Sequence, residues 1–473
     1  MEADASGLNP ALRGAAVESF VIDSREAQAG ACFFALSQPE YKNNCFNGDF
    51  ADSTKYAASA LENGATAAIV RPDRYEEHKA ELEKFADRLI FAADVIAAFQ
   101  KLAHGVYLEW NKPIVAVTGS AGKTTAKELT AHVLEKSVRK VLRSIKNYNN
   151  GLGVPITVLN LAKDDSYDVA VLEMGMSTPH NEIARLCRIT PPDVAVELNV
   201  LPVHVEHLGS IENVAKAKAE LVEGMKPDGT AILNADDWRV LAMRELHAGK
   251  TITFGIENAA DVSASEIEMK RFGETKFVLN LRGEKADVRS SLSGKHNVLN
   301  ALAASAVGFS FGMSAREIAN ALQTIAPPPQ RGEVLHFADD FTVINDSYNS
   351  NPAALLGMVE TLIDGGKSAT RKIVVAGEML ELGAAEKEIH TETGKQLAAS
   401  GIEFLIGVRG LAKDLVESAN NLVETKFFDN SDEAGEFLAN EIRAGDLVLI
   451  KGSRGVRTEK VVEKLLEKYR LEE

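Results

Sequence analysis

The chain has 473 residues, which is more than one ordinary hydrophobic core holds and fits two to four domains. Hydrophobic residues make up 45% and charged residues 25%, a composition typical of a folded globular protein. The net charge of -16 argues against binding to nucleic acid or anionic membranes, because phosphate groups attract basic surfaces. The N-terminus does not resemble a signal peptide, no apolar run is long enough to span a bilayer, and the cysteines lack metal-site or redox spacing. We therefore expect a cytoplasmic protein without membrane insertion.

Two breaks divide the chain. The first is the segment Trp-Asn-Lys-Pro at residues 110–113, directly before an apolar run. The second, at residues 326–330, contains three consecutive prolines, which stop a helix and stiffen a connection. These breaks predict domains at residues 1–112, 113–326 and 327–473.

Short apolar runs alternate with helical stretches in the second and third domains. In the second domain the runs are Ile114–Thr118, Asp168–Leu172, Asp193–Val196 and Thr230–Leu233. In the third they are Phe341–Ile344, Lys372–Val375, Phe404–Val408 and Asp446–Ile450. Continuous apolar runs separated by helices are typical of parallel strands buried on both faces. The pattern predicts an α/β fold with a mixed α+β first domain, a central parallel-sheet domain of the P-loop type and a Rossmann-like third domain.

A glycine-rich loop follows the first of these runs. Residues 119–125 read Gly-Ser-Ala-Gly-Lys-Thr-Thr and open a predicted helix over Ala126–Lys136. Glycines let backbone amides turn toward a phosphate, and the helix N-terminus adds positive potential. Lys123 would reach the terminal phosphates and the Thr124 hydroxyl would bind Mg²⁺. Val117 stands where the longer phosphate-loop pattern has its first glycine, so this is the shorter G-x-x-G-K-T form. A turn that binds nothing is the alternative, which the lysine and threonines disfavour.

Two candidate metal ligands follow strands of the central domain. Glu173 comes directly after one apolar run, and His204 follows the next. Because the carboxyl ends of parallel strands face the phosphate loop, both side chains are well placed to bind Mg²⁺. Either residue alone is more often solvated or a cap, but the two together beside a phosphate loop favour a metal site.

A lysine interrupts the apolar stripe of a predicted helix over Ile211–Met225. Lys218 falls at the centre of that stripe, whereas Lys216 and Glu220 fall on the opposite face. An unpaired ammonium is costly in such a position. Lys218 either extends along its methylene stem to water, or is neutralised or modified beside a metal.

Two asparagines share the small-residue face of another predicted helix. Asn297 and Asn300 lie on the same face as Ala301, Ala304 and Gly308. Buried amides need hydrogen-bond partners, which a purine ring edge would supply. A helix cap with a structural asparagine is an equal alternative.

These motifs together resemble the Mur ligase family over nearly the whole chain. The segments that carry the resemblance are the loop at residues 119–125, Glu-Met-Gly at 173–175, Asn199 to His204, Ala-Lys-Ala-Glu at 217–220 and His-Asn-x-x-Asn at 296–300. Four further segments are similar to the members that add a D-alanyl-D-alanine dipeptide; they lie at residues 147–150, 345–352, 378–383 and 449–455. The Asp-Asn-Pro-Arg signature of the members that add a diamino acid is absent.

The resemblance implies an ATP-dependent ligase that joins D-alanyl-D-alanine to UDP-N-acetylmuramoyl-tripeptide through an acyl phosphate. It implies two Mg²⁺ ions and a lysine carbamylated by CO₂ at Lys218, with Lys123, Lys218 and His204 as catalytic residues. The implied metal ligands are Thr124, Glu173, His204 and Lys218. The implied ATP-binding residues are Gly119, Ser120, Ala121, Gly122, Lys123, Thr124, Thr125, Asn297, Asn300, Arg331 and Asp346.

The same resemblance places the two other substrates. The first domain would hold the UDP-sugar, and the third would contact the dipeptide and the nucleotide. The implied substrate-binding residues are Ser24, Arg25, Asn149, Asn150, Tyr348, Asn349 and Asn351. The partners are small molecules only, the chain is expected to be a monomer, and the third residue of the tripeptide, lysine or diaminopimelate, is left open.

Three other functions fit the sequence less well. Another Mur-type ligase or a folylpolyglutamate-type ligase would share the ATP site, but residues 346–352 argue against both. A nucleotide switch or transport ATPase would leave Lys218 and His204 unexplained. A member that only binds nucleotide-sugar would not need Lys123, Glu173 and Lys218.

Overall fold

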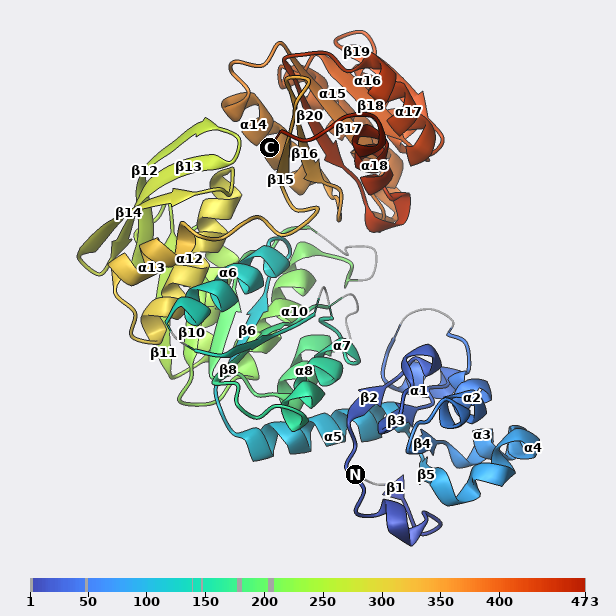
Figure 1. Cartoon of the computed structure of the whole chain (residues 1–473). Coiled ribbons are helices and arrows are strands. Elements are labelled where there is room, and N and C mark those ends of the chain that lie inside the picture. Colours follow the sequence, from blue (N-terminus) through green and yellow to red (C-terminus); the bar gives the residue numbers. More distant parts are fainter. Residues whose placement is uncertain are drawn as a thin grey trace. The chain divides into compact units, whose positions relative to one another are not determined.

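Three β-sheets, each built from its own stretch of the sequence, organise the described chain (Figure 1). The computed structural model describes residues 3–46, 50–137, 139–145, 148–176, 181–202 and 208–472, with the backbone only at residues 270 and 271. The predicted α/β class, with a largely parallel central sheet, is confirmed. Among the described helices, none combines the length and apolar character needed to cross a membrane.

Contacts between Cα atoms divide the chain into two compact units. The first comprises residues 1–118, 139–195 and 217–229, and the second comprises residues 119–138, 196–216 and 230–473. The predicted domain boundaries after residues 112 and 326 stay predictions.

The first sheet has five strands in the order β1-β5-β4-β3-β2. They are β1 (Ala3–Asp4), β2 (Ser19–Val21), β3 (Ala31–Phe34), β4 (Ala67–Val70) and β5 (Leu89–Ala92). All neighbours are parallel except β1 and β5. Helix α5 (Val95–Trp110) packs against this sheet, and the rings of Phe34 and Phe99 meet edge to face with centroids 4.7 Å apart.

A buried carboxyl group joins two helices of this part. Glu40 lies in α1 (Gln38–Asn43) and is fully buried. One carboxyl oxygen accepts from the Ser37 amide at 2.7 Å, and the other accepts from the amide of Val95, the first residue of α5, at 2.6 Å. Burial raises the pKa of Glu40 to about 7, against an ordinary value of 4.5. The folded protein therefore retains a proton that the unfolded chain releases.

The sign of the resulting pH dependence follows from proton linkage. Stability from Glu40 is present below pH 4.5 and is lost as the pH rises to about 7, because the unfolded chain then holds fewer protons. The loss amounts to at most about 3 kcal/mol. We expect the free energy of unfolding in urea to fall more steeply over this pH range for the wild-type protein than for Glu40→Gln. The exposed Glu81→Gln variant is the control, and equal slopes in all three proteins would contradict the prediction.

The central sheet has nine strands in the order β14-β13-β12-β11-β10-β9-β6-β8-β7. The strands are β6 (Ile114–Thr118), β7 (Val141–Arg143), β8 (Val169–Glu173), β9 (Val194–Glu197), β10 (Thr230–Asn234), β11 (Lys250–Gly255), β12 (Val262–Arg271), β13 (Glu274–Leu281) and β14 (Glu284–Ser290). The four predicted apolar runs correspond to β6, β8, β9 and β10, which are almost entirely buried. The antiparallel extension formed by β12, β13 and β14 was not predicted.

The third sheet has six strands in the order β15-β16-β20-β17-β18-β19. The strands are β15 (Glu333–Phe337), β16 (Phe341–Asp346), β17 (Arg371–Gly377), β18 (Phe404–Val408), β19 (Glu424–Phe428) and β20 (Asp446–Lys451). Helices α14 (Pro352–Gly365), α15 (Glu386–Ala399) and α16 (Ala412–Ala419) contribute to one core, and α17 (Ser431–Glu441) and α18 (Glu459–Lys468) contribute to another. Alternate residues of β17 enter the two cores, so helices cover both faces, as the Rossmann-like prediction requires.

Candidate active site

The phosphate loop depends on two glycines in the left-handed half of backbone space. Gly119 has φ +154° and Gly122 has φ +85°. A Cβ at Gly119 would lie 2.8 Å from the Leu198 Cβ, and one at Gly122 would lie 2.5 Å from Oδ1 of Asn300. A larger residue would be strained and would clash at either position. The loop leads into α6 (Lys123–Lys136), whose N-terminus carries the positive end of the helix dipole.

Asn199 holds the loop in place. Its side-chain oxygen accepts from the Ala121 amide at 2.8 Å, its side-chain nitrogen donates to the Ala121 carbonyl at 3.1 Å, and its own carbonyl accepts from the Ser120 amide at 2.9 Å. The Ser120 hydroxyl also donates to the carbonyl of Leu201 at 3.1 Å. Two of the loop amides are thus used within the protein. The amides of the first turn of α6 are the ones best placed to meet a phosphate.

The Lys123 ammonium folds back over its own loop. It donates to the Gly119 carbonyl at 2.8 Å and to the Ser120 carbonyl at 3.4 Å. These two carbonyls are neutral, and a phosphate anion accepts a stronger hydrogen bond from an ammonium than a neutral carbonyl does.

The predicted adenine-side helix packs against the phosphate loop. Helix α12 (Lys295–Ser310) contacts α6, and Asn300 of α12 lies against Gly122. The two buried asparagines are linked, because Asn300 donates to Oδ1 of Asn297 at 3.2 Å and Asn297 donates to the Ser293 carbonyl at 2.8 Å. Sequence reasoning placed both asparagines on one face, and the structure brings that face to the loop.

Glu173 ends strand β8 rather than following it. Its strand partner is Val117, two residues before Gly119, and it is only 2% exposed. The Asn149 side chain donates to Oε1 of Glu173 at 2.8 Å, and the Glu173 amide donates to the Ser144 hydroxyl at 3.0 Å. Asn149 therefore orients the carboxylate that is predicted to bind Mg²⁺. Its predicted contact with substrate stays a prediction.

Asn150 also has a partner within the chain. Its side-chain oxygen accepts from the amides of Leu152 and Gly153 at 3.1 and 2.9 Å. It thereby shapes the start of α7 (Gly153–Leu159), and its predicted role in substrate binding stays a prediction.

Lys218 lies on helix α10 (Ile211–Glu223) and is 2% exposed. Val214, Leu221 and Val222 of the same helix are buried as well, whereas Lys216 is exposed. The predicted apolar stripe with a lysine at its centre is thus confirmed, but Glu220, which was predicted on the opposite face, is half-buried and accepts from the Ala184 amide at 3.0 Å. The other predicted metal ligand, His204, lies outside the described residues.

The third sheet gathers predicted residues at the carboxyl ends of its strands. Asp346, the last residue of β16, accepts from the Lys451 ammonium at 2.5 Å. The Arg331 guanidinium lies over the Tyr348 ring, 4.0 Å from its centroid. Asn351 caps α14 by accepting from the Ala354 amide at 2.9 Å.

Lys451 was not among the predicted site residues. A lysine that ends a buried strand, as Asp346 ends the neighbouring one, is the signal that could have identified it.

Ser24 and Arg25, which are predicted to contact the uridine, lie in a tight turn after Asp23. Arg25 is exposed and its guanidinium binds both carboxylate oxygens of Asp23, at 2.9 and 2.6 Å. This pairing lowers the pKa of Asp23 to about 2. Ser24 and Arg25 form the short helix η2 (Ser24–Glu26), and their predicted contact with a nucleotide-sugar stays a prediction.

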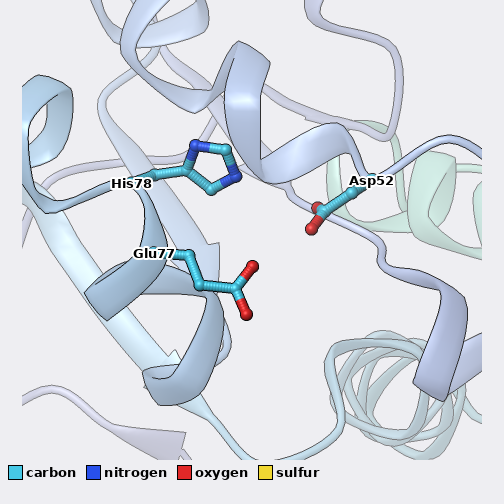
Figure 2. Close-up of side chains that lie close together, drawn as sticks. All are labelled: Asp52, Glu77 and His78. Carbon is cyan, nitrogen blue, oxygen red and sulfur yellow. The ribbon is translucent and has the colours of Figure 1, made fainter.

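A group with metal-ligand chemistry lies away from the predicted ligands. The ligand atoms of Asp52, Glu77 and His78 are within 4.8 Å of one another, and Figure 2 shows these side chains turned toward a common space. However, Arg74 pairs with Glu77 at 2.7 Å and with Asp52 at 3.8 Å. A cation already balances the two carboxylates, so we assign no metal to this group.

Comparison with known proteins defines the class to which this fold and loop belong. A model of the Mur ligase middle domain matches residues 117–308, and a model of the Mur ligase glutamate ligase domain matches residues 330–454. The chain belongs to the Mur ligase family.

Particular members of the family are similar along nearly the whole chain. The UDP-N-acetylmuramoyl-tripeptide--D-alanyl-D-alanine ligase of Bacillus subtilis is 30% identical over 465 residues, covering 97% of this chain and 95% of that protein. The crystal structure of MurF from Acinetobacter baumannii has a TM-score of 0.83 at 29% identity, covering 96% of this chain and 94% of the other. MurF ligase from Thermotoga maritima, solved in complex with ADP, has a TM-score of 0.79 at 27% identity. That match covers 98% of this chain and 99% of the other.

Proposed function

We propose that this protein is an ATP-dependent ligase that joins D-alanyl-D-alanine to UDP-N-acetylmuramoyl-tripeptide. The observation that carries the proposal is the phosphate loop with Asn300 against Gly122, in a chain similar along 97% of its length to a ligase named for this reaction. The predicted ATP-side residues of α6 and α12 meet at this point. The reaction would take place in the cytoplasm on small-molecule substrates, with the protein as a monomer.

The chemistry has two steps. An oxygen of the tripeptide carboxylate attacks the γ-phosphorus of ATP, ADP leaves, and an acyl phosphate forms. The amine of the dipeptide then attacks the acyl carbon, loses a proton, and expels inorganic phosphate, which leaves an amide bond. Phosphoryl transfer demands little covalent chemistry from a protein, so positioning and neutralisation of charge supply most of the catalysis.

The chain provides cationic and dipolar groups for this task. Lys123 would turn from the carbonyls of Gly119 and Ser120 to phosphate oxygens, and the first turn of α6 would donate its amides. Asn297 and Asn300 would border the adenine side, and Arg331 and Asp346 would reach the nucleotide from the third domain.

A hydroxyl and a carboxylate suit Mg²⁺, which prefers hard oxygen ligands. The Thr124 hydroxyl and the Glu173 carboxylate are both mostly buried, and Asn149 already orients the carboxylate. These two residues would hold one ion, and His204 with Lys218 would help to hold a second. Bound Mg²⁺ would supply positive charge against the phosphates.

Lys218 would serve the second ion as a carbamate. The neutral amine attacks the carbon of CO₂, forms an N–C bond and loses a proton, which replaces an ammonium with a carboxylate-like anion. Lys218 is only 2% exposed, and this buried position supports a modified lysine rather than one that extends to water.

The outer domains would hold the other two substrates, and the central domain would add contacts to the tripeptide. Ser24 and Arg25 would contact the uridine end of the sugar nucleotide, and Asn149 and Asn150 the tripeptide side. Tyr348, Asn349 and Asn351 would contact the dipeptide.

A product assay tests the function directly. Purified protein is mixed with ATP, Mg²⁺, D-alanyl-D-alanine and UDP-N-acetylmuramoyl-tripeptides ending in lysine or diaminopimelate. We expect phosphate release only with both peptide substrates present, and a product mass equal to the sum of the two minus one water. ATP hydrolysis indifferent to both substrates would refute the ligase assignment, as would preference for glutamate and a folate acceptor.

A further inference from the structure

Two largely shielded charges of opposite sign end neighbouring parallel strands of the third sheet. Asp346 ends β16, Lys451 ends β20, and the two residues are direct partners in the strand register. The Lys451 ammonium donates to Oδ2 of Asp346 at 2.5 Å and to the carbonyl of Asn349 at 2.8 Å. The side chains are only 5% and 14% exposed. A single ammonium therefore ties the end of β16 to the turn that follows it.

The same end of β20 bridges to a second loop. The Ser453 hydroxyl accepts from the Leu380 amide, which follows β17, at 3.0 Å, and donates to the Ser350 carbonyl at 3.4 Å. Strand β20 lies between β16 and β17, and Ser453, which follows it, links the loops after those two strands. Ligands of open α/β sheets bind at this edge, beyond the carboxyl ends of the strands.

A buried ion pair is weak evidence for stability on its own, because removing two charges from water costs several kcal/mol. An ion pair that bears this desolvation cost can still serve the protein by fixing a loop in one conformation. Here the lysine neutralises a carboxylate and fixes a backbone carbonyl only three residues further along.

From this geometry we infer that Lys451 is a positioning residue, which holds the loop at residues 346–351 in the conformation that meets the substrates. The inference rests on the proposed ligase function, since this loop carries Asp346, Tyr348, Asn349 and Asn351. Lys451 acts through the loop and does not itself touch the reacting atoms.

The opposite end of the same strand supplies a matched control. Asp446 begins β20 and pairs with Arg371 at the start of β17, with contacts of 2.9 and 2.7 Å to its two carboxylate oxygens. This pair is buried and lies in the same sheet, but no predicted site residue lies at that edge. Removing it perturbs the sheet without touching the loop at residues 346–351.

The kinetic test compares Lys451→Met and Lys451→Gln with Arg371→Met. We expect kcat/KM for the dipeptide to fall about 10- to 100-fold in both Lys451 variants, as for other losses of positioning. We expect it to stay within about twofold in Arg371→Met, even where that variant melts at a lower temperature. Parallel losses in all three variants, or unchanged kcat/KM in the Lys451 variants, would overturn the inference.

A second measurement does not depend on turnover. Hydrogen exchange of the peptide covering residues 346–351 is expected to accelerate in Lys451→Gln and to remain at the wild-type rate in Arg371→Met. Equal exchange in Lys451→Gln and the wild type would refute the positioning role. Absence of any ligase product with the wild-type protein would refute the proposed function instead, so the two failures are distinguishable.

Discussion

Replacing Lys123 with methionine is expected to reduce ligase turnover by at least about 100-fold, the loss typical of removing one group that stabilises developing charge. Lys123 begins α6, and its ammonium already lies over the phosphate loop, 2.8 Å from the Gly119 carbonyl. Methionine keeps the length and apolar stem of the side chain but cannot neutralise a phosphate. The assay is phosphate release under saturating substrates, together with the mass of the product.

Lys136→Met is the matched control for this variant. Lys136 ends the same helix and is exposed, so its replacement is expected to leave turnover unchanged. Circular dichroism verifies that both variants are folded. A tenfold fall in turnover corresponds to a rise of about 1.4 kcal/mol in the activation free energy. If Lys123→Met retained more than about a tenth of wild-type turnover, the lysine would not neutralise charge in the reaction.

The Lys218→Ala variant is expected to lose about 100-fold or more in turnover and to recover part of it in acetate or formate. The carbamate would supply an anionic oxygen to a metal, and a short carboxylate entering the space left by the side chain could replace it. Wild-type turnover should also fall in buffer depleted of CO₂ and return on addition of bicarbonate.

Lys216→Ala is the control, because it lies on the same helix but is exposed. It should retain wild-type turnover and show no response to acetate. Full activity of Lys218→Ala would contradict the carbamate role. Loss of activity in that variant without any rescue, combined with indifference to CO₂, would indicate a structural role for this buried lysine.

The buried strands were predictable because burial on both faces leaves a direct mark on the sequence. The predicted runs at Ile114–Thr118 and Phe404–Val408 coincide with β6 and β18. The antiparallel extension was missed because its strands bury only one face. Strand β13 nevertheless alternates half-buried and buried residues without exception, which is the period-2 signal of such a strand.

The candidate site was predictable where chemistry is concentrated in one short segment. The loop at residues 119–125 and the stripe around Lys218 are of this kind. The contacts of Asn199 and Lys451 were not predicted, because each joins residues that are far apart in the sequence. Asn199 binds Ala121, 78 residues earlier, and Lys451 binds Asp346, 105 residues earlier. No local pattern records such a pairing, since strand order decides it.

The position of β20 in its sheet has a consequence for synthesis of the protein on the ribosome. The chain makes β16, β17, β18 and β19 before it makes Asp446–Lys451, yet β20 occupies the place between β16 and β17. Until that strand emerges, two central strands expose unpaired backbone edges and apolar faces, which is a hazard for aggregation. The loop at residues 346–351, which is proposed to contact the dipeptide, therefore reaches its final place late. A nascent chain stopped before residue 446 would contain the complete loop at residues 119–125 but would lack the central strand of the third sheet.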